Sequence, residues 1–173
     1  MFALNFMLFK NKYRIESTRL KGYDYSSPGA YFITIKTAKG ESFFGDIENK
    51  KMVLNETGKT ATEYWKKIPD HFPYVILDEY IFMPDHFHGI IFLDEYKTLQ
   101  KRQPVGVIIN QFKRTCTIQI RKSEINFKWQ SRFHDHVIRN ENELDRIRQY
   151  IIDNPKNWKS GDEFNSDELT FEI

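Results

Sequence analysis

Hydrophobic and polar positions along the chain follow two repeats, one of two residues and one of three to four. Residues 30–37 (AYFITIKT) are rich in β-branched and aromatic side chains and lie between the turn sequences YSSPG and AKGE, which predicts a β-strand. SFFGDI (42–47) is expected to be its hairpin partner. YVILDEYIFMP (74–84) and HFHGIIFL (86–93) predict two further strands, joined by a turn at Pro84–Asp85.

Two segments with the longer repeat predict helices. In ETGKTATEYWKKIPDHFP (56–73) the apolar residues stand at helical spacing, and the helix is expected to end at Pro69. VGVIINQFKRTCTIQIRK (105–122) places apolar residues on one stripe and polar or basic residues on another. The second helix should therefore have a buried face and a basic exposed face.

A third helix is predicted within IRNENELDRIRQYIIDNP (138–155). Asn140 is a good N-cap and Glu143 follows three residues later, the spacing of a capping box. The helix is expected to end where Pro155 removes a backbone donor. Its predicted buried stripe consists of Leu144, Ile147 and Ile151.

Strands paired in hairpins and separated by amphipathic helices are typical of α+β proteins. We expect a ferredoxin-like antiparallel sheet with helices mostly on one face. The chain has 173 residues, of which 40% are hydrophobic; this is enough for one packed core and too few for two ordinary domains. One domain over residues 1–173 is expected, with a basic N-terminal segment (1–22) and an acidic tail (160–173).

The formal net charge is only +2, but the charges are segregated along the chain. Residues 101–122 contain six Lys or Arg and no acid, and residues 1–22 contain five against the single acid Glu16. After Lys159 there are five acids and no base. Segregation of this kind creates the positive potential that a polyanion-binding surface needs, although a solvated helix face has the same pattern.

The cysteine content and the first residues limit the cellular compartments in which the protein is expected. Cys116 is the single cysteine, which excludes an intramolecular disulfide and a multi-cysteine zinc site and indicates a reducing compartment, the cytoplasm. MFALNFMLF (1–9) is too short to span a membrane and has no signal-peptide pattern. We expect an edge strand or a loosely ordered segment there, and no membrane partner.

A His-x-His pair stands at the start of the predicted strand 86–93. Residues two apart in a strand share a face, so His86 and His88 would lie side by side at about 7 Å between Cα atoms, within reach of one metal ion. Buried histidines that are only hydrogen-bonded are the alternative. Tyr150 and Asn154 are neighbours on one helix face, and the Asn154 amide oxygen would complete a mixed N/O site for Mg²⁺ or Mn²⁺.

These motifs resemble a known family. MPDHFHGI (83–90) looks like the histidine-hydrophobic-histidine motif of the HUH endonucleases, and YIIDNP (150–155) resembles the catalytic tyrosine helix of their single-tyrosine transposases. RLKGYDYSSPGAYFITIKT, FFGDI and WQSRFHDHVIRNENELDRIRQYIIDNPKNW extend the likeness to the REP-associated tyrosine transposases over residues 19–158.

The resemblance implies a ferredoxin-like fold and metal-dependent cleavage and joining of single-stranded hairpin DNA. The sequence leaves open whether the chain acts as a monomer or as a homodimer. His86 and His88 become ligands of Mg²⁺ or Mn²⁺, Asn154 the third ligand, and Tyr150 the nucleophile that forms a 5′-phosphotyrosine. Two other classes stay open: a binding module for structured nucleic acid that does not cut it, and a metal-dependent phosphodiesterase that uses water.

The DNA contacts are predicted from the charge pattern and the resemblance together. A second His-x-His, His134 and His136, is expected to contact phosphate or support the metal site from outside rather than to ligate the ion. Trp129 could stack on an unpaired base or belong to the core. The residues predicted to contact DNA are Lys113, Arg114, Arg121, Lys122, Arg19, Lys21, Trp129 and His136.

Overall fold

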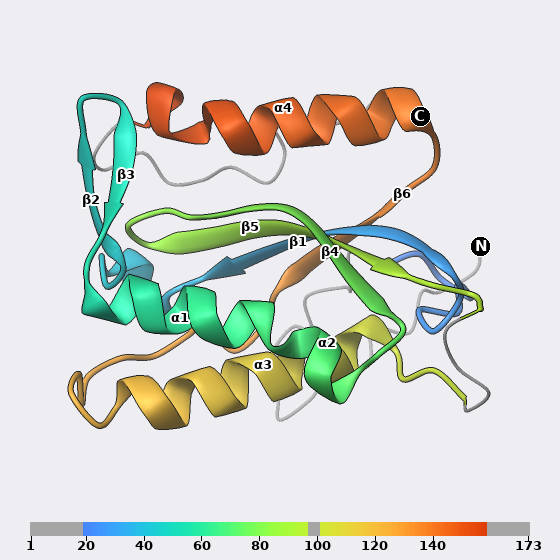
Figure 1. Cartoon of the computed structure of the whole chain (residues 1–173), viewed down its shortest axis with the longest axis horizontal. Helices are drawn as coiled ribbons and strands as arrows, with labels where there is room; N and C mark the ends of the chain where they lie inside the picture. The colour runs from blue at the N-terminus through green and yellow to red at the C-terminus, as the bar shows by residue number, and fades with distance from the viewer. Residues whose placement is uncertain (1–18, 97–100, 159–173) are drawn as a thin grey trace, which may run out of the picture.

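The computed structural model describes residues 19–96 and 101–158 (Figure 1). The start of the basic N-terminal segment, residues 1–9 included, and the acidic tail lie outside the described residues. A four-stranded antiparallel sheet with the order β4-β5-β1-β6 forms the centre of the fold. Its strands are β1 (Gly29–Lys36), β4 (Val75–Phe82), β5 (His86–Leu93) and β6 (His134–Ile138).

Helices connect these strands in the ferredoxin-like pattern. α1 (Glu56–Lys66) and the short α2 (Ile68–His71) lie between β1 and β4, and α3 (Val105–Ile120) lies between β5 and β6. The resulting β-α-β-β-α-β order and the strand arrangement confirm the expected α+β, ferredoxin-like class.

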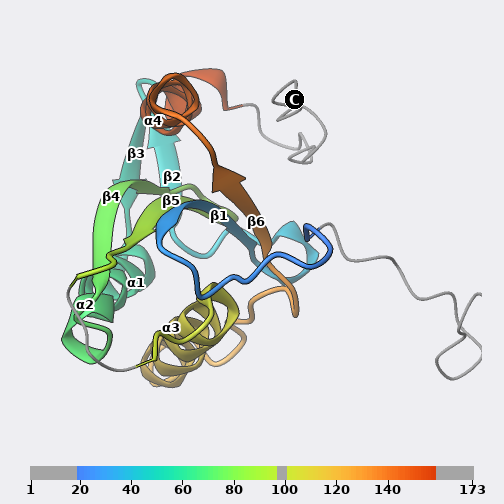
Figure 2. The same cartoon turned by 90° about the vertical axis from the view of Figure 1, so that its right-hand side faces the viewer.

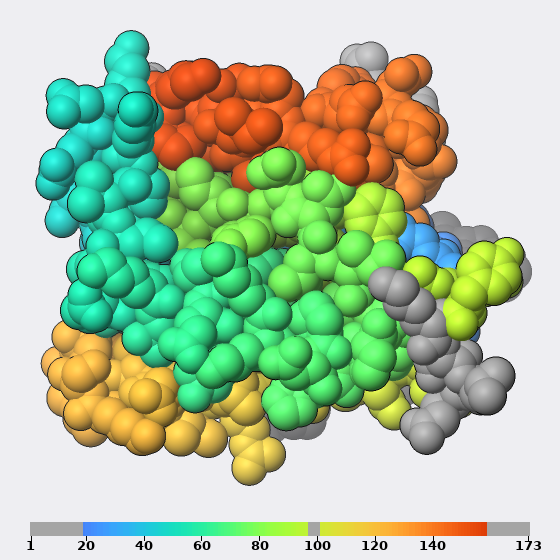
Figure 3. All heavy atoms as spheres, viewed as in Figure 1, coloured from blue at the N-terminus to red at the C-terminus, as the bar shows by residue number. Residues whose placement is uncertain are grey.

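The helices cover the two faces of the sheet unequally. α1, α2 and α3 pack on one face, whereas α4 (Glu141–Asn157) lies alone on the other (Figure 2). In the space-filling view α4 forms one side of the molecule and α1 with α3 the opposite side (Figure 3). Helices are thus mostly on one face, as predicted, but the helix that carries Tyr150 is on the other.

Strand alternation divides the core into two clusters. Odd-numbered residues of β1 join the larger cluster beneath α1 and α3, and even-numbered residues face α4. The larger cluster contains Tyr31, Ile33 and Ile35 of β1. The smaller cluster contains Ala30, Phe32, Ile90, Ile138, Leu144, Ile147 and Ile151, so the predicted stripe of the last helix is confirmed as buried.

The expected pairing of 42–47 with the first strand is wrong. β2 (Gly45–Glu48) pairs instead with β3 (Lys51–Leu54) in a separate two-stranded sheet. The reason is that both edges of β1 are occupied, one by β5 and the other by β6, so β1 offers 42–47 no backbone partners.

Neither proline ends its helix where the sequence predicted. Pro69 lies in the first turn of α2, where a missing N–H costs nothing, so one more helical turn follows α1. Pro155 is buried inside α4, which continues to Asn157. It stands in the last turn, and losing one i to i−4 bond there does not end the helix. In the part of the chain that the structure describes, no helix is both long and apolar enough to cross a membrane.

Candidate active site

The α4-facing side of the sheet changes from apolar to polar along the strands. Thr34 of β1 pairs with His88 of β5, and Lys36 pairs with His86. On its other edge Thr34 pairs with His134 of β6. Because positions two apart share a face, these five side chains continue the α4 face beyond its apolar cluster. The structure thus gathers imidazoles, a hydroxyl and an ammonium at one end of the sheet.

The two histidines of the His-x-His motif lie together and are held by polar neighbours. His86 and His88 have ring centroids 4.7 Å apart and are almost completely buried. His86 Nδ1 lies 2.6 Å from Asp85 Oδ1, and His88 Nδ1 lies 2.9 Å from Thr34 Oγ1. Since Nδ1 of each ring is engaged in this way, Nε2 is the nitrogen by which each ring would bind a metal.

The protonation state of His88 suits a ligand. Burial holds the pKa of His88 well below its usual value, and the nearby His86, Lys36 and His134 lower it further. A neutral imidazole keeps a lone pair for metal binding, whereas a protonated ring has none.

Tyr150 reaches this pair from α4. Its hydroxyl oxygen lies 3.4 Å from His88 Nε2, and its ring packs edge-on against His88 and Phe32, at centroid distances of 5.3 Å and 6.2 Å. Tyr150 is half-buried, as is Asn154 one helical turn later. The structure therefore brings the predicted nucleophile to the predicted ligands and leaves Asn154 on the same side of α4.

The beginning of α4 is fixed by a cap. Asn140 Oδ1 accepts a hydrogen bond from the Glu143 N–H at 2.9 Å, as the capping-box spacing predicts. The buried Glu143 carboxylate accepts from the Arg139 N–H at 2.7 Å and lies 2.7 Å from His136 Nε2. Burial raises the pKa of Glu143, but the hydrogen bonds from Arg139 and His136 outweigh it, and the pKa is lowered overall.

Two further contacts fix α4 along its length. Arg148 donates through Nε and Nη2 to Asp78 Oδ2 of β4, at 3.0 Å and 2.6 Å. At the other end of α4 the ring of Trp158 lies 5.7 Å from that of His86. Together with the buried stripe, these contacts determine where Tyr150 stands on the sheet.

The histidines supply only part of the donor set that a hard divalent ion would need. His86 and His88 supply two oriented nitrogens, and Asn154 could add an amide oxygen. Within residues 19–96 and 101–158, no group of three or more His, Cys, Asp and Glu is placed to hold a metal. His134 therefore does not join His86 and His88 as a third histidine ligand.

Lys113 and Trp129, both predicted DNA contacts, are buried. Lys113 Nζ donates to the carbonyls of Gln130, Ser131 and Arg132 at 2.7 Å, 3.3 Å and 3.4 Å, and burial lowers the pKa of Lys113 to about 8. Trp129 is 6% exposed and packs among aromatic rings of the larger cluster. These placements do not support a phosphate contact by Lys113 or base stacking by Trp129.

Arg19 and His136 are engaged within the protein. Arg19 Nε donates to Asp135 Oδ1 at 2.8 Å, and its guanidinium lies over the rings of Tyr25 and Phe133. His136 contacts Glu143, as described above, and so helps to fix α4. Lys21 is exposed.

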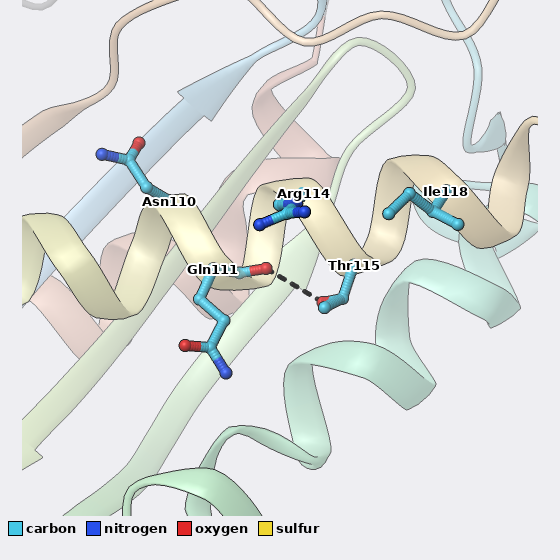
Figure 4. Close-up of a pocket in the computed structure, with 5 residues that line it drawn as sticks. All are labelled: Asn110, Gln111, Arg114, Thr115 and Ile118. Atoms are coloured by element: carbon cyan, nitrogen blue, oxygen red, sulfur yellow. Dashed lines mark hydrogen bonds between the residues drawn. The ribbon is translucent and has the colours of Figure 1, made fainter.

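The remaining predicted contacts lie on α3 or at its end, across the sheet from Tyr150. Arg114, Arg121 and Lys122 are exposed, and Arg121 Nε donates to the Phe127 carbonyl at 2.9 Å. Arg114 also lines a surface hollow of about 530 Å³ along α3, drawn in Figure 4. The hollow contains none of the histidines or Tyr150, so the basic face of α3 and the histidine–tyrosine site are separate surfaces.

Sequence reasoning missed three residues of the site, which are Thr34, Lys36 and Asp85. Asp85 directly precedes the His-x-His motif, and Thr34 and Lys36 interrupt an apolar strand at alternate positions. Both patterns were visible in the sequence. What the sequence did not give is the strand register that sets Thr34 and Lys36 beside the histidines.

Comparisons with known proteins agree with this description. The fold is α+β and ferredoxin-like, and the His-x-His pair on its sheet faces the helix that carries Tyr150. No family model matches the chain. It is 40% identical over 160 residues to an uncharacterized protein of Haemophilus influenzae, covering 83% of this chain and 89% of that protein, and so belongs to the same family.

A solved structure shares the fold. The REP-associated tyrosine transposase bound to a REP hairpin superposes with a TM-score of 0.51 and 21% identity, over 82% of this chain and 73% of that chain. The chain therefore has the fold of a REP-associated tyrosine transposase, as the sequence motifs predicted.

Proposed function

We propose that this protein cleaves and rejoins single-stranded hairpin DNA, with Tyr150 as the nucleophile beside a Mg²⁺ or Mn²⁺ ion held by His86, His88 and Asn154. The observation that carries the proposal is the 3.4 Å separation of the Tyr150 hydroxyl and His88 Nε2. The shared fold with a transposase that binds a REP hairpin supports hairpin DNA as the substrate class.

The residues around the site would each have a defined part in the reaction. Asp85 and Thr34 hold the two imidazoles in one orientation, and the contacts along α4 hold Tyr150 against them. When bound, the divalent ion supplies positive charge to a phosphate that otherwise resists attack. Burial of His88 keeps its ring neutral and therefore able to act as a ligand.

The covalent step is a displacement at phosphorus. The Tyr150 oxygen forms a bond to phosphorus and the bond from phosphorus to the 3′ oxygen breaks. The phenol proton is released, and the leaving 3′ oxygen takes up a proton, which gives a 5′-phosphotyrosine and a free 3′-hydroxyl. Because the phosphotyrosine keeps a phosphodiester bond, attack by a 3′-hydroxyl reverses the step, and rejoining needs no nucleotide cofactor.

A covalent adduct tests the proposal. The protein is incubated with Mg²⁺ or Mn²⁺ and a panel of single-stranded DNA hairpins, each labelled on the 3′ side of the break. The label should become attached to the protein and slow its migration on a denaturing gel. Tyr150→Phe removes one oxygen and keeps the ring that packs on Phe32, so this variant should bind the hairpin and acquire no label.

The control variant is Tyr80→Phe, because Tyr80 lies on β4 and packs against the larger cluster on the other face of the sheet. It should form the adduct as the wild type does. Cleavage by Tyr150→Phe would mean that water or another residue is the nucleophile. Hairpin binding without any adduct in the wild type would leave a non-catalytic binding module as the better description.

A further inference from the structure

Trp158 differs from the other two tryptophans of the chain. Trp65 and Trp129 are buried among the aromatic rings of the larger cluster, at 0% and 6% exposure. Trp158 is the C-cap of α4, is half-buried, and belongs to neither apolar cluster. Its ring lies 5.7 Å from that of His86, with 39° between the two planes. A large flat ring therefore stands partly in solvent beside the proposed metal ligands.

Trp158 also continues the line of site residues along α4. Tyr150, Asn154 and Trp158 follow one another at intervals of four residues and so share a helix face. The ring of Tyr150 lies 5.3 Å from that of His88, and the rings of His88 and His86 are 4.7 Å apart. Tyr150 and Trp158 therefore stand at opposite ends of the histidine pair, separated by about 12 Å of helix rise.

Anchoring of the helix does not by itself account for this tryptophan. Ile151 and Pro155 are buried and already pack the last turns of α4 against the protein. Contact with His86 requires only an apolar side chain, whereas an indole adds a broad face that costs free energy while water covers it. The part of the Trp158 ring left in solvent is available to a flat apolar partner.

Single-stranded DNA provides such a partner. An unpaired base has an apolar face, and bases stack on aromatic side chains with little regard to sequence. In a displacement at phosphorus the attacking and leaving oxygens lie roughly in line, on opposite sides of the phosphorus atom. With Tyr150 at the His88 end of the pair, the leaving 3′ oxygen faces the His86 end, where Trp158 stands.

We infer that Trp158 stacks on the base of the nucleotide immediately 5′ of the break, the nucleotide whose 3′ oxygen leaves. The inference rests on the proposed function and adds a residue to it. Trp158 itself forms and breaks no covalent bond. Once the phosphotyrosine has formed, stacking holds the fragment with the free 3′-hydroxyl beside it, so that rejoining can follow.

The first test needs neither metal nor cleavage. Tryptophan emission is recorded while the protein is titrated with single-stranded DNA hairpins in the presence of a chelator. Because Trp65 and Trp129 are buried, stacking on Trp158 should account for the quenching seen in wild type. Trp158→Phe should still bind DNA, followed by gel shift, and should show almost no quenching. The same quenching in Trp158→Phe, or none in DNA-saturated wild type, would overturn the inference.

The second test finds the stacked base. Hairpins with one abasic site at each unpaired position in turn are bound in chelator. Wild type should lose affinity about tenfold at one position. Trp158→Leu keeps an apolar contact with His86 but has no ring, so it should bind that abasic hairpin and the intact one equally. Trp158→Phe should retain most of the difference. An abasic effect of wild-type size in Trp158→Leu would reduce Trp158 to an anchor of α4.

The matched control is Tyr96→Leu, which removes a 90% exposed ring beyond the other end of β5 from His86. It should respond to the abasic sites as wild type does. Loss of the abasic effect in Tyr96→Leu as well as in Trp158→Leu would overturn the inference, because the effect would then not depend on a ring beside the histidines.

The break, mapped from the wild-type adduct, links the stacked base to the reaction. The sensitive position should be the nucleotide immediately 5′ of the break. A sensitive position anywhere else would overturn the inference while the proposed function stands. If no hairpin gives an adduct but one position still depends on Trp158, the proposed function is rejected and base stacking by Trp158 stands.

Discussion

The two faces of the central sheet have different compositions and different roles. One face is apolar along β1 and β5 and is covered by α1 and α3, with residues such as Tyr31, Ile33 and Ile35 completely buried. The other face is apolar only beneath part of α4, and beyond it buries polar side chains, among them His86 and His88. Because side chains alternate along a strand, neighbouring residues of β1 and β5 contribute to opposite faces. The apolar face stabilises the fold, and the half-polar face offers chemistry.

The strongest test of this comparison uses adjacent residues of β5. Phe87 is completely buried against Trp65 and Phe82 on the apolar face. Phe87→Ala should lower the free energy of unfolding by about 3–5 kcal/mol, because it removes the transfer energy of the ring and leaves a cavity. Denaturant unfolding measures the change. A loss below about 1 kcal/mol, well under the usual cost of truncating a buried Phe, would contradict the division of roles between the faces.

Replacing His86, the residue just before Phe87, should affect cleavage rather than stability. His86→Ala should reduce Mg²⁺- or Mn²⁺-dependent cleavage at least about 100-fold, because removing a ligand should cost at least as much as removing its supporting partner. Hairpin binding should remain, since phosphate contacts dominate affinity. Gel-shift and cleavage assays separate the two effects. Full cleavage by His86→Ala, or by wild type in excess chelator, would return the motif to a structural role.

The anchoring of α4 on the half-polar face predicts a pH dependence. Glu143→Gln should lower the free energy of unfolding by about 1–2 kcal/mol at pH 7, because a charged hydrogen-bond acceptor is replaced by a neutral one. The pKa of Glu143 is lowered in the folded protein. Its contribution to the free energy of unfolding is therefore present above the pKa of 4.5 in the unfolded chain, and it is lost as the pH falls through the pKa in the folded protein. The difference between wild type and variant should therefore shrink below pH 4.5.

The control for this experiment is Glu141→Gln, an exposed acid in the same first turn of α4. It carries the same helix-dipole effect without the buried contacts, so it should cost less than about 0.5 kcal/mol. Unfolding curves between pH 3 and pH 7 would compare the two variants. An equal effect of both would show that the dipole, and not the hydrogen bonds of Glu143, fixes the helix end.

The smallest effect is expected on the far side of the sheet. The sequence predicts that Arg114 and Arg121 contact DNA, and the structure separates them from Tyr150 by the whole sheet. If DNA is confined to the α4 face, replacing both by Ala should change the log–log salt slope of binding by less than about 0.7, the equivalent of one phosphate of single-stranded DNA. A larger decrease would show that the DNA wraps around an edge of the sheet to reach α3.

Local spacing was enough to predict several parts of the site. His86 and His88 share a face because they are two apart in a strand, and Tyr150 and Asn154 because they are four apart in a helix. The cap formed by Asn140 and Glu143 is also local, and it lies where predicted. Strand β6 was not predicted, because His134, Asp135 and His136 give it no apolar alternation.

Tertiary structure decided the features that depend on distant pairing. The sequence alone determined the ferredoxin-like class, the His-x-His pair and the tyrosine helix, since each follows from spacing along the chain. It did not determine that Lys36 stands beside His86, that Lys113 is buried, or that α3 and α4 lie on opposite faces. These follow from strand register and from the choice of face each helix covers, and both are set by contacts between residues far apart in the chain.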